Sequence, residues 1–179
     1  MKGYPPSLKR RLRGPVLSLR RIVLSAFVRR RPAFDRASVR RILVLRMDGL
    51  GDMVLTTPLF DALAAGFPGA RIAVLAPLPA AAAVEGHPAV VRSIPFSPTG
   101  AGSAVEAVRA AGEEPFDLAV DPTTDHVLAP ARAAARLGRF AAGFAGGGRE
   151  RFNSDCPGPP PPAGSKPQRI LALSLPLRC

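Results

Sequence analysis

The chain has 179 residues, of which 47% are hydrophobic and 21% are charged, a length that suits one domain with one buried core. Its two cysteines and two histidines form no pattern of disulfides or metal ligands, so the sequence predicts no metal site and a reducing compartment. No apolar run reaches the ~18 to 20 residues that cross a bilayer, and arginines interrupt the N-terminal apolar stretch where a secretory signal would be continuous.

The net charge of +12 is concentrated at the N-terminus. Met1 to Arg41 holds 13 of the 25 Lys and Arg residues and one acidic residue, so the rest of the chain is neutral. Residues 16–31 have the pattern of a basic amphipathic helix, which suits an anionic membrane surface. We therefore expect residues 1–40 to be a basic amphipathic arm on that surface; a solvated or self-docked arm is the alternative. No nucleic-acid partner is expected, because the arm has few aromatics and no DNA-binding motif.

The first predicted strand is Ile42 to Leu45, a short apolar run typical of a buried parallel strand. A turn follows in which Gly49 and Gly51 are expected to permit backbone angles and close approaches that other residues resist. Such a turn presents backbone N–H groups and the positive end of a helix dipole to a cleft at the carboxyl end of a sheet. The sequence therefore predicts a polar ligand there.

Two starts are possible for the helix that follows. Asp52 could cap it, with Pro58 then producing a kink, or Thr57 could cap it with Pro58 at the first helical position. We favour a single kinked helix that starts near Gly51 and ends around Gly66.

Strands and helices then alternate along the chain. The predicted strands are 71–76, 90–94, 116–120 and 140–144, and the predicted helices are 79–85, 103–111 and 126–137. This alternation indicates βαβ units, hence an α/β fold with a Rossmann-like parallel sheet and flanking helices. After Phe144 the pattern stops, and the proline-rich run beyond Cys156 predicts an extended spacer. We therefore expect an arm over 1–40, a domain over 41–150, and a disordered tail or truncated interdomain linker over 151–179.

The stretch from Arg41 reads RILVLRMDGLGDMVLTTPL and continues with Ala-Leu and then Phe-Pro-Gly-Ala-Arg-Ile. It resembles the opening of the family 9 glycosyltransferases, the lipopolysaccharide heptosyltransferases. The resemblance is good over 41–96, weaker over 116–151 and absent in the tail. It implies the GT-B architecture, in which two Rossmann-like domains face each other, the first holding mainly the acceptor and the second mainly the nucleotide sugar. This chain would be the N-terminal, acceptor-binding half alone: a fragment, a truncated product or a degenerate copy.

The activity that the resemblance implies is transfer of a sugar, with inversion, from a nucleotide donor such as ADP-heptose. The acceptor would be a lipid-linked saccharide of the lipopolysaccharide-core type. No further cofactor is expected, and the protein would be cytoplasmic and peripheral on the inner membrane face.

Asp52 is the candidate catalytic residue. In the family that the sequence resembles, the aspartate of the Gly-Asp pair after the first strand is the proposed base, and Gly51-Asp52 occupies that place. A carboxylate within hydrogen-bond reach of the acceptor hydroxyl suffices for this chemistry. From the residues alone, Asp52 could merely cap a helix. A helix N-terminus would also lower its pKa and weaken it as a base, unless a bound acceptor desolvates it.

Six residues around Asp52 are candidate substrate-binding residues: Gly49, Gly51, Arg46, Asp48, Thr56 and Thr57. Arg46 suits two-pronged contacts to a phosphate or carboxylate, or else pairs with Asp48 or Asp52. Asp48 would orient Arg46 or the acceptor, or remain a solvated turn residue. The two threonines could donate hydrogen bonds into the cleft, although threonine before proline is first a helix-start signal.

A second group of polar residues follows the fourth predicted strand and could line the same crevice: Asp121, Thr123, Thr124, Asp125 and His126. Here the sequence departs from the family, in which a glutamine or glycine is expected soon after the aspartate. A lone histidine at a helix start is more typical of a capping or surface position than of a base.

Two other functions stay open. The chain could be a non-catalytic remnant of the fold that binds a membrane surface or a partner. It could also be an NAD-type nucleotide-binding protein, but the glycine fingerprint lacks its third glycine. In addition, Ile72 to Leu78 contains no acidic residue to bind a ribose.

Overall fold

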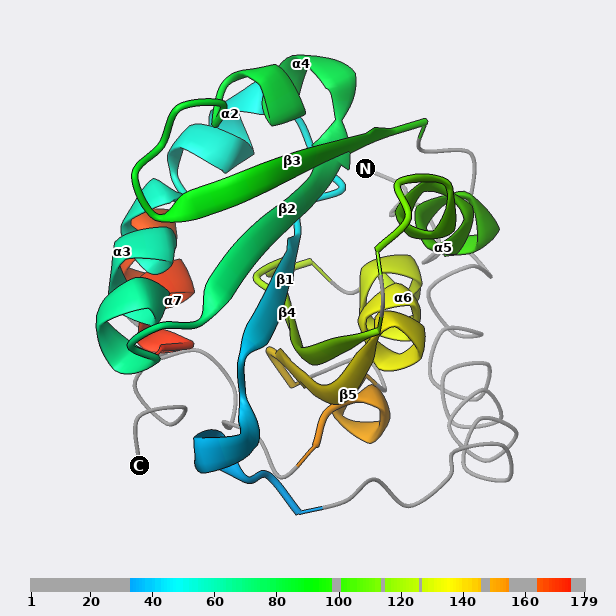
Figure 1. The fold of residues 1–179 in the computed structure, drawn as a ribbon. Coiled ribbons are helices and arrows are strands. Elements are labelled where there is room, and N and C mark those ends of the chain that lie inside the picture. The colour runs from blue at the N-terminus through cyan, green and yellow to red at the C-terminus, as the bar shows by residue number, and fades with distance from the viewer. Residues whose placement is uncertain are drawn as a thin grey trace, which may run out of the picture. The chain divides into compact units, whose positions relative to one another are not determined.

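The computed structural model describes residues 33–97, 101–113, 115–125, 127–145, 149–154 and 164–174 (Figure 1). The arm's amphipathic stretch, the proline-rich run over 155–163 and His126 lie outside the described residues. Five strands form one sheet in the order β3-β2-β1-β4-β5, and every pairing is parallel. The predicted Rossmann-like α/β class is confirmed.

The strands are β1 (Arg41–Leu45), β2 (Arg71–Pro77), β3 (Val90–Phe96), β4 (Phe116–Asp121) and β5 (Gly138–Gly143). Each predicted strand exists, with ends within a few residues of those expected. The run from Ile42 to Leu45 is fully buried because β1 is the central strand and both of its faces are covered. A continuous apolar run is what a strand in that position requires.

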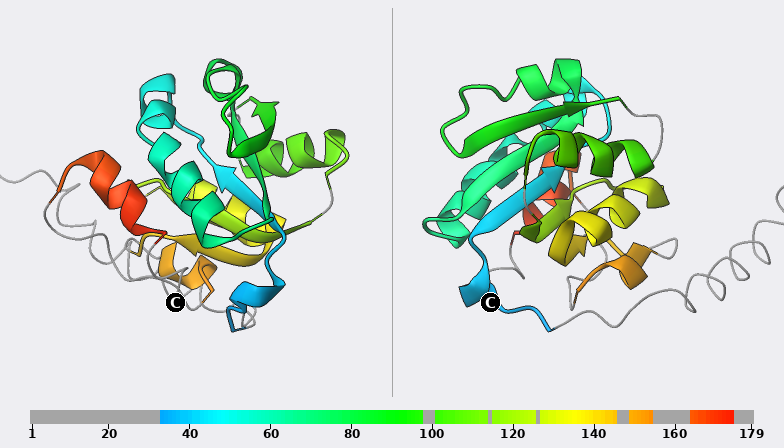
Figure 2. Two further views of the ribbon diagram at one scale, coloured as in Figure 1. Left: turned by 60° about the vertical axis from the view of Figure 1, so that its left-hand side comes forward. Right: turned by 45° about the vertical axis from the view of Figure 1, so that its right-hand side comes forward.

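The helices are α2 (Leu50–Val54), α3 (Thr57–Gly66), α4 (Leu78–Ala82), α5 (Ala101–Ala110), α6 (Leu128–Leu137) and α7 (Lys166–Ala172), with short 3-10 turns η1 (Arg36–Ser38) and η2 (Arg149–Phe152). α3 and α7 cover one face of the sheet and α5 and α6 cover the other (Figures 1 and 2). α2 contacts α4 near the carboxyl ends of the central strands.

The expectation of one kinked helix after β1 is wrong, because the chain forms two helices. Pro58 has no N–H to donate to the carbonyl of Val54, and its ring would crowd that carbonyl in a continuous helix. The Thr57 hydroxyl donates to the Val54 carbonyl instead, at 2.9 Å. α2 therefore ends at Val54, and α3 starts at Thr57 with Pro58 in its first turn.

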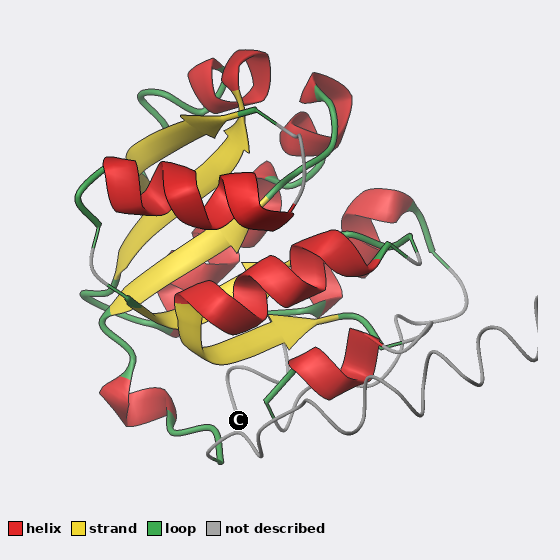
Figure 3. Cartoon of the chain, turned by 90° about the vertical axis from the view of Figure 1, so that its right-hand side faces the viewer, coloured by secondary structure: helices red, strands yellow, loops and turns green. Residues whose placement is uncertain are grey.

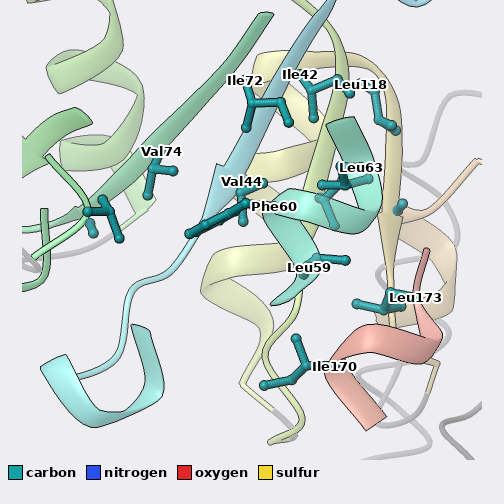
Figure 4. Close-up of a cluster of buried hydrophobic side chains, with 14 of the residues drawn as sticks. Ile42, Val44, Leu59, Phe60, Leu63, Ile72, Val74, Leu118, Ile170 and Leu173 are labelled. Carbon is teal, nitrogen blue, oxygen red and sulfur yellow. The ribbon is translucent and has the colours of Figure 1, made fainter. Parts of the chain in front are cut away.

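Helix α7 lies within the segment expected to be a disordered tail. Its Ile170 and Leu173 are fully buried and project toward the core formed by α3 and the sheet (Figure 4). Leu59 and Leu63 of α3 belong to the same core, so α7 covers an apolar surface that would otherwise face water. The three segment boundaries stay predictions, but the expected disorder does not apply to residues 164–174.

The segment after η2 covers the outer edge of β5 (Figure 3). The Ser154 N–H donates to the Ala141 carbonyl at 2.7 Å, and the Ala141 N–H donates to the Ser154 hydroxyl at 3.1 Å. The Asn153 side chain donates to the Gly143 carbonyl at 2.7 Å. These bonds satisfy backbone groups that an edge strand leaves open.

Candidate active site

The candidate site lies at the carboxyl ends of β1 and β4. The chain leaves β1 toward β2 on one side, whereas β4 leads to β5 on the other, so the strand order reverses between these two strands. In open α/β sheets ligands bind outside the carboxyl ends of the strands at such a reversal. Val44 pairs with Val120, which brings the residues that follow β1 beside those that follow β4.

Asp52 is placed by α2, but it does not cap that helix. Gly49 is the N-cap residue, and the helix has no side-chain cap. The backbone N–H of Asp52 donates to the Gly49 carbonyl at 3.1 Å, while its carboxylate, 27% exposed, pairs with two cations instead. The capping role that competed with a chemical role for Asp52 is therefore not seen.

Arg46, immediately after β1, is one of these cations and is fully buried. Its backbone N–H donates to the Leu75 carbonyl at 2.9 Å, which continues the β1–β2 ladder by one residue. Its Nη2 lies 3.3 Å from Asp52 Oδ1, and its Nη1 lies 3.4 Å from Asp48 Oδ2. The predicted group of Arg46, Asp48 and Asp52 is thus brought together.

The guanidinium of Arg46 has unused hydrogen-bonding capacity. Within the described residues, its Nε, Nη1 and Nη2 have no aligned hydrogen-bond acceptor, although the two carboxylates are close. Leaving buried donors unpaired is costly. The charges of Asp48 and Asp52 offset this cost, so Arg46 is a buried counter-ion that holds the two carboxylates together.

Lys166, the first residue of α7, is the other cation beside Asp52. Its Nζ contacts Oδ1, the same oxygen that faces Arg46. Burial of Asp52 raises its pKa, but the hydrogen bond from Lys166 and the charges of Arg46 and Lys166 outweigh burial, so the pKa lies below its usual value. The carboxylate is thus fully ionised at neutral pH.

Lys166 was not predicted from the sequence. The available signal was the spacing Ser165-x-x-Gln168 before an apolar run, which is typical of a capping box at a helix start. In the structure the Ser165 N–H donates to Gln168 Oε1 at 2.9 Å. That signal locates the helix, but it does not show that α7 reaches Asp52.

The two glycines of the turn do not have the unusual backbone that the sequence suggested. Gly49 has φ −75° and ψ 176°, and Gly51 also lacks a positive φ. A Cβ added at either position would meet no atom within 4 Å. The expectation that the backbone requires glycine there is wrong, and what the glycines leave is open space beside the start of α2.

Thr56 and Thr57 use their hydroxyl protons within the α2–α3 region. The Thr56 hydroxyl, in a fully buried side chain, donates to the Asp52 carbonyl at 2.7 Å. The Thr57 hydroxyl donates to Val54, as described above. Neither hydroxyl proton is left for a substrate in this arrangement, and the substrate-binding role predicted for them remains only a prediction.

The loop after β4 is held by Arg149, which the sequence analysis missed. Arg149 Nη2 donates to Asp121 Oδ2, and its Nη1 donates to the carbonyls of Thr123 and Asp125, at 2.5 and 2.7 Å. The Thr123 N–H donates to Asp121 Oδ1 at 3.0 Å. Burial raises the pKa of Asp121 despite the opposing charge of Arg149. These contacts fix the described part of the loop, and they do not involve the side chain of Thr124.

In the part of the chain that the structure describes, no three His, Cys, Asp or Glu side chains are grouped so as to hold a metal ion. No described helix is both long enough and apolar enough to span a bilayer.

No model of a known protein family matches the sequence, and no curated protein matches it. Solved structures do match. Escherichia coli heptosyltransferase WaaC with ADP superposes with a TM-score of 0.57 at 17% identity, over 76% of this chain and 46% of that chain. The glycosyl transferase family 9 protein of Veillonella parvula has a TM-score of 0.61 at 15% identity, over 82% and 43%.

This chain has the fold of the heptosyltransferases. E. coli ADP-heptose lps heptosyltransferase II matches as well, with a TM-score of 0.56 at 22% identity, over 75% of this chain and 40% of that chain. The resemblance noted in the sequence is confirmed at the level of fold. The chain spans less than half the length of these solved proteins, in keeping with one Rossmann-like domain of the GT-B architecture.

Proposed function

We propose that this chain is the acceptor-binding half of an inverting glycosyltransferase of the heptosyltransferase type, with Asp52 as its general base. The observation that carries the proposal is the position of the Asp52 carboxylate. It stands at the carboxyl end of the central strand, is partly exposed, and is paired with cations rather than with the amides of its own helix. The fold shared with heptosyltransferases supports this assignment.

The reaction would proceed by direct displacement. An acceptor hydroxyl attacks the anomeric carbon of a nucleotide sugar such as ADP-heptose, and the bond from that carbon to the diphosphate oxygen breaks. Asp52 takes the hydroxyl proton as the new glycosidic bond forms, and the nucleoside diphosphate leaves with the electron pair of the broken bond. A second domain would hold the donor, and this chain would hold and orient the acceptor.

The other residues of the turn suit acceptor binding. The open space beside Gly49 and Gly51 allows an acceptor to approach the start of α2 closely. Arg46 is fully buried and holds the carboxylates of Asp48 and Asp52 in place for the acceptor. We propose a lipid-linked saccharide of the lipopolysaccharide-core type as the acceptor.

The test joins this chain to a donor-binding heptosyltransferase domain and compares turnover of wild type and Asp52→Asn. The amide cannot accept the proton, so we expect turnover to fall at least ~100-fold, the lower range for general-base catalysis. Asp61→Asn is the matched control, because Asp61 is an exposed aspartate on α3. Unchanged turnover in Asp52→Asn would refute the assignment and favour a non-catalytic binding module.

We also propose that residues 1–40 attach the protein to the cytoplasmic face of an anionic membrane. The proposal rests on the sequence pattern of that arm. Within residues 16–31, helical spacing puts Arg21 and Arg29 on one stripe and apolar residues on most of the remaining surface. Flotation with vesicles of phosphatidylglycerol and phosphatidylethanolamine should carry the full chain but not a chain that lacks residues 1–40. Equal flotation of the two would dismiss the arm as the attachment site.

A further inference from the structure

The two cations beside Asp52 contact one oxygen of its carboxylate. Arg46 Nη2 lies 3.3 Å from Oδ1, and the Lys166 ammonium donates to the same Oδ1. Within the described residues, no hydrogen bond is donated to Oδ2. The carboxylate is therefore anchored through Oδ1, its side chain is 27% exposed, and Oδ2 has no hydrogen-bond donor among the described residues.

Lys166 is held in this position by the rest of α7. Ile170 and Leu173 are fully buried against α3 and the sheet, which fixes the helix against α3 with Lys166 in reach of Asp52. A positive charge on the first residue of a helix is electrostatically unfavourable, because the helix dipole is positive at that end. The Asp52 carboxylate offsets this repulsion, so the position of the lysine depends on its partner.

We propose that Lys166 is a positioning residue for the general base: together with Arg46 it anchors Asp52 through Oδ1 and leaves Oδ2 as the atom that accepts the acceptor's proton. This inference rests on the proposed function. It adds a residue from the C-terminal segment to a site for which the sequence offered candidates only from the ends of the first and fourth predicted strands.

The charged groups around Asp52 determine how the loss of Lys166 would change the pKa of that carboxylate. Arg46 approaches from the end of β1, Lys166 approaches from α7, and Asp48 shares the guanidinium of Arg46. These four groups are neutral in sum. Without the lysine, two carboxylates would share one guanidinium, so Asp52 would hold its proton to a higher pH and its carboxylate would lose one of two anchors.

The direct test is NMR of the Asp52 side-chain carboxyl carbon during a pH titration of the 179-residue chain, in wild type and three variants. Lys166→Met should move the Asp52 titration to higher pH, and Lys166→Arg, which keeps the charge, should restore most of the difference. Arg132→Met removes an exposed charge from α6, on the opposite face of the sheet, and should leave the titration unchanged. Thermal unfolding of each variant shows whether the fold is kept.

A kinetic measurement completes the test, using this chain joined to a donor-binding heptosyltransferase domain. Lys166→Met should lower turnover roughly tenfold, with little change in KM, because misplacing a reacting group slows the chemical step more than binding. An Asp52 titration that does not move in Lys166→Met would overturn the inference, as would wild-type turnover in that variant. If the titration moves but Asp52→Asn remains fully active, the ion pair stands and the proposed function fails.

Discussion

Arg149, on η2, donates a hydrogen bond to the carboxylate of Asp121 at the end of β4, and both side chains are buried. The same guanidinium bonds to the carbonyls of Thr123 and Asp125. One side chain from the segment after β5 therefore holds residues 121–125, at the start of the connection between β4 and α6. Because that loop borders the candidate site, Arg149 stabilises the site without being part of its chemistry.

The first prediction is that Arg149→Met lowers the free energy of unfolding by about 3 to 5 kcal/mol, because it leaves the Asp121 carboxylate buried without its partner. Urea denaturation measures the change. Arg109→Met removes an exposed arginine from α5 and should have little effect. The double variant with Asp121→Asn should recover much of the loss, since it removes the stranded charge. A loss below about 1 kcal/mol in Arg149→Met would contradict the importance of the pair.

The second prediction concerns the pH dependence of that loss. The pKa of Asp121 is raised by burial in the wild type, and without Arg149 it should rise further. An aspartate whose pKa is higher in the folded than in the unfolded chain stabilises the fold when the pH is below the unfolded-chain pKa. That stabilisation is lost as the pH rises through the folded-chain pKa. The destabilisation of Arg149→Met should therefore be smaller at pH 4 than at pH 7. If the difference in free energy of unfolding between wild type and Arg149→Met did not depend on pH, Asp121 would not be the group that loses its partner.

The sequence was sufficient to predict the five strands and their parallel arrangement because the strand signals are local. Ile42 to Leu45 must be apolar on both faces if β1 is central, and that requirement is visible in four consecutive residues. The group of Arg46, Asp48 and Asp52 was also predictable, since all three residues belong to one turn.

The contacts that the sequence did not predict join distant segments. Lys166 is 114 residues from Asp52, and Arg149 is 28 residues from Asp121. Neither pairing has a local signal, because each depends on how a helix or loop packs across the sheet. The conformation of Gly49 and Gly51 was misjudged for a related reason: a glycine pair indicates freedom, but only coordinates show whether the backbone uses it.

The third prediction uses two glycines with opposite surroundings. Gly51→Ala adds a Cβ into open space within a helix and should raise the free energy of unfolding by up to about 1 kcal/mol. Gly138→Ala should destabilise the chain by about 1 to 3 kcal/mol, because its Cβ would lie 2.7 Å from Ala119. If an acceptor occupies the space beside α2, Gly51→Ala should also weaken its binding, as calorimetry with a core saccharide would show. Destabilisation by Gly51→Ala would contradict the open surroundings of that residue.

The fourth prediction tests whether α7 belongs to the folded domain. Ile170→Ala should lower the free energy of unfolding by about 2 to 5 kcal/mol, because it removes a fully buried side chain from the core beside α3. Leu171→Ala is the matched control. Leu171 is the next residue along α7 and is 38% exposed, so truncating its side chain should cost far less than truncating Ile170. Urea denaturation of both variants measures the difference. Equal, small effects would mean that α7 does not contribute to the core, and Lys166 would then have no fixed position from which to hold Asp52.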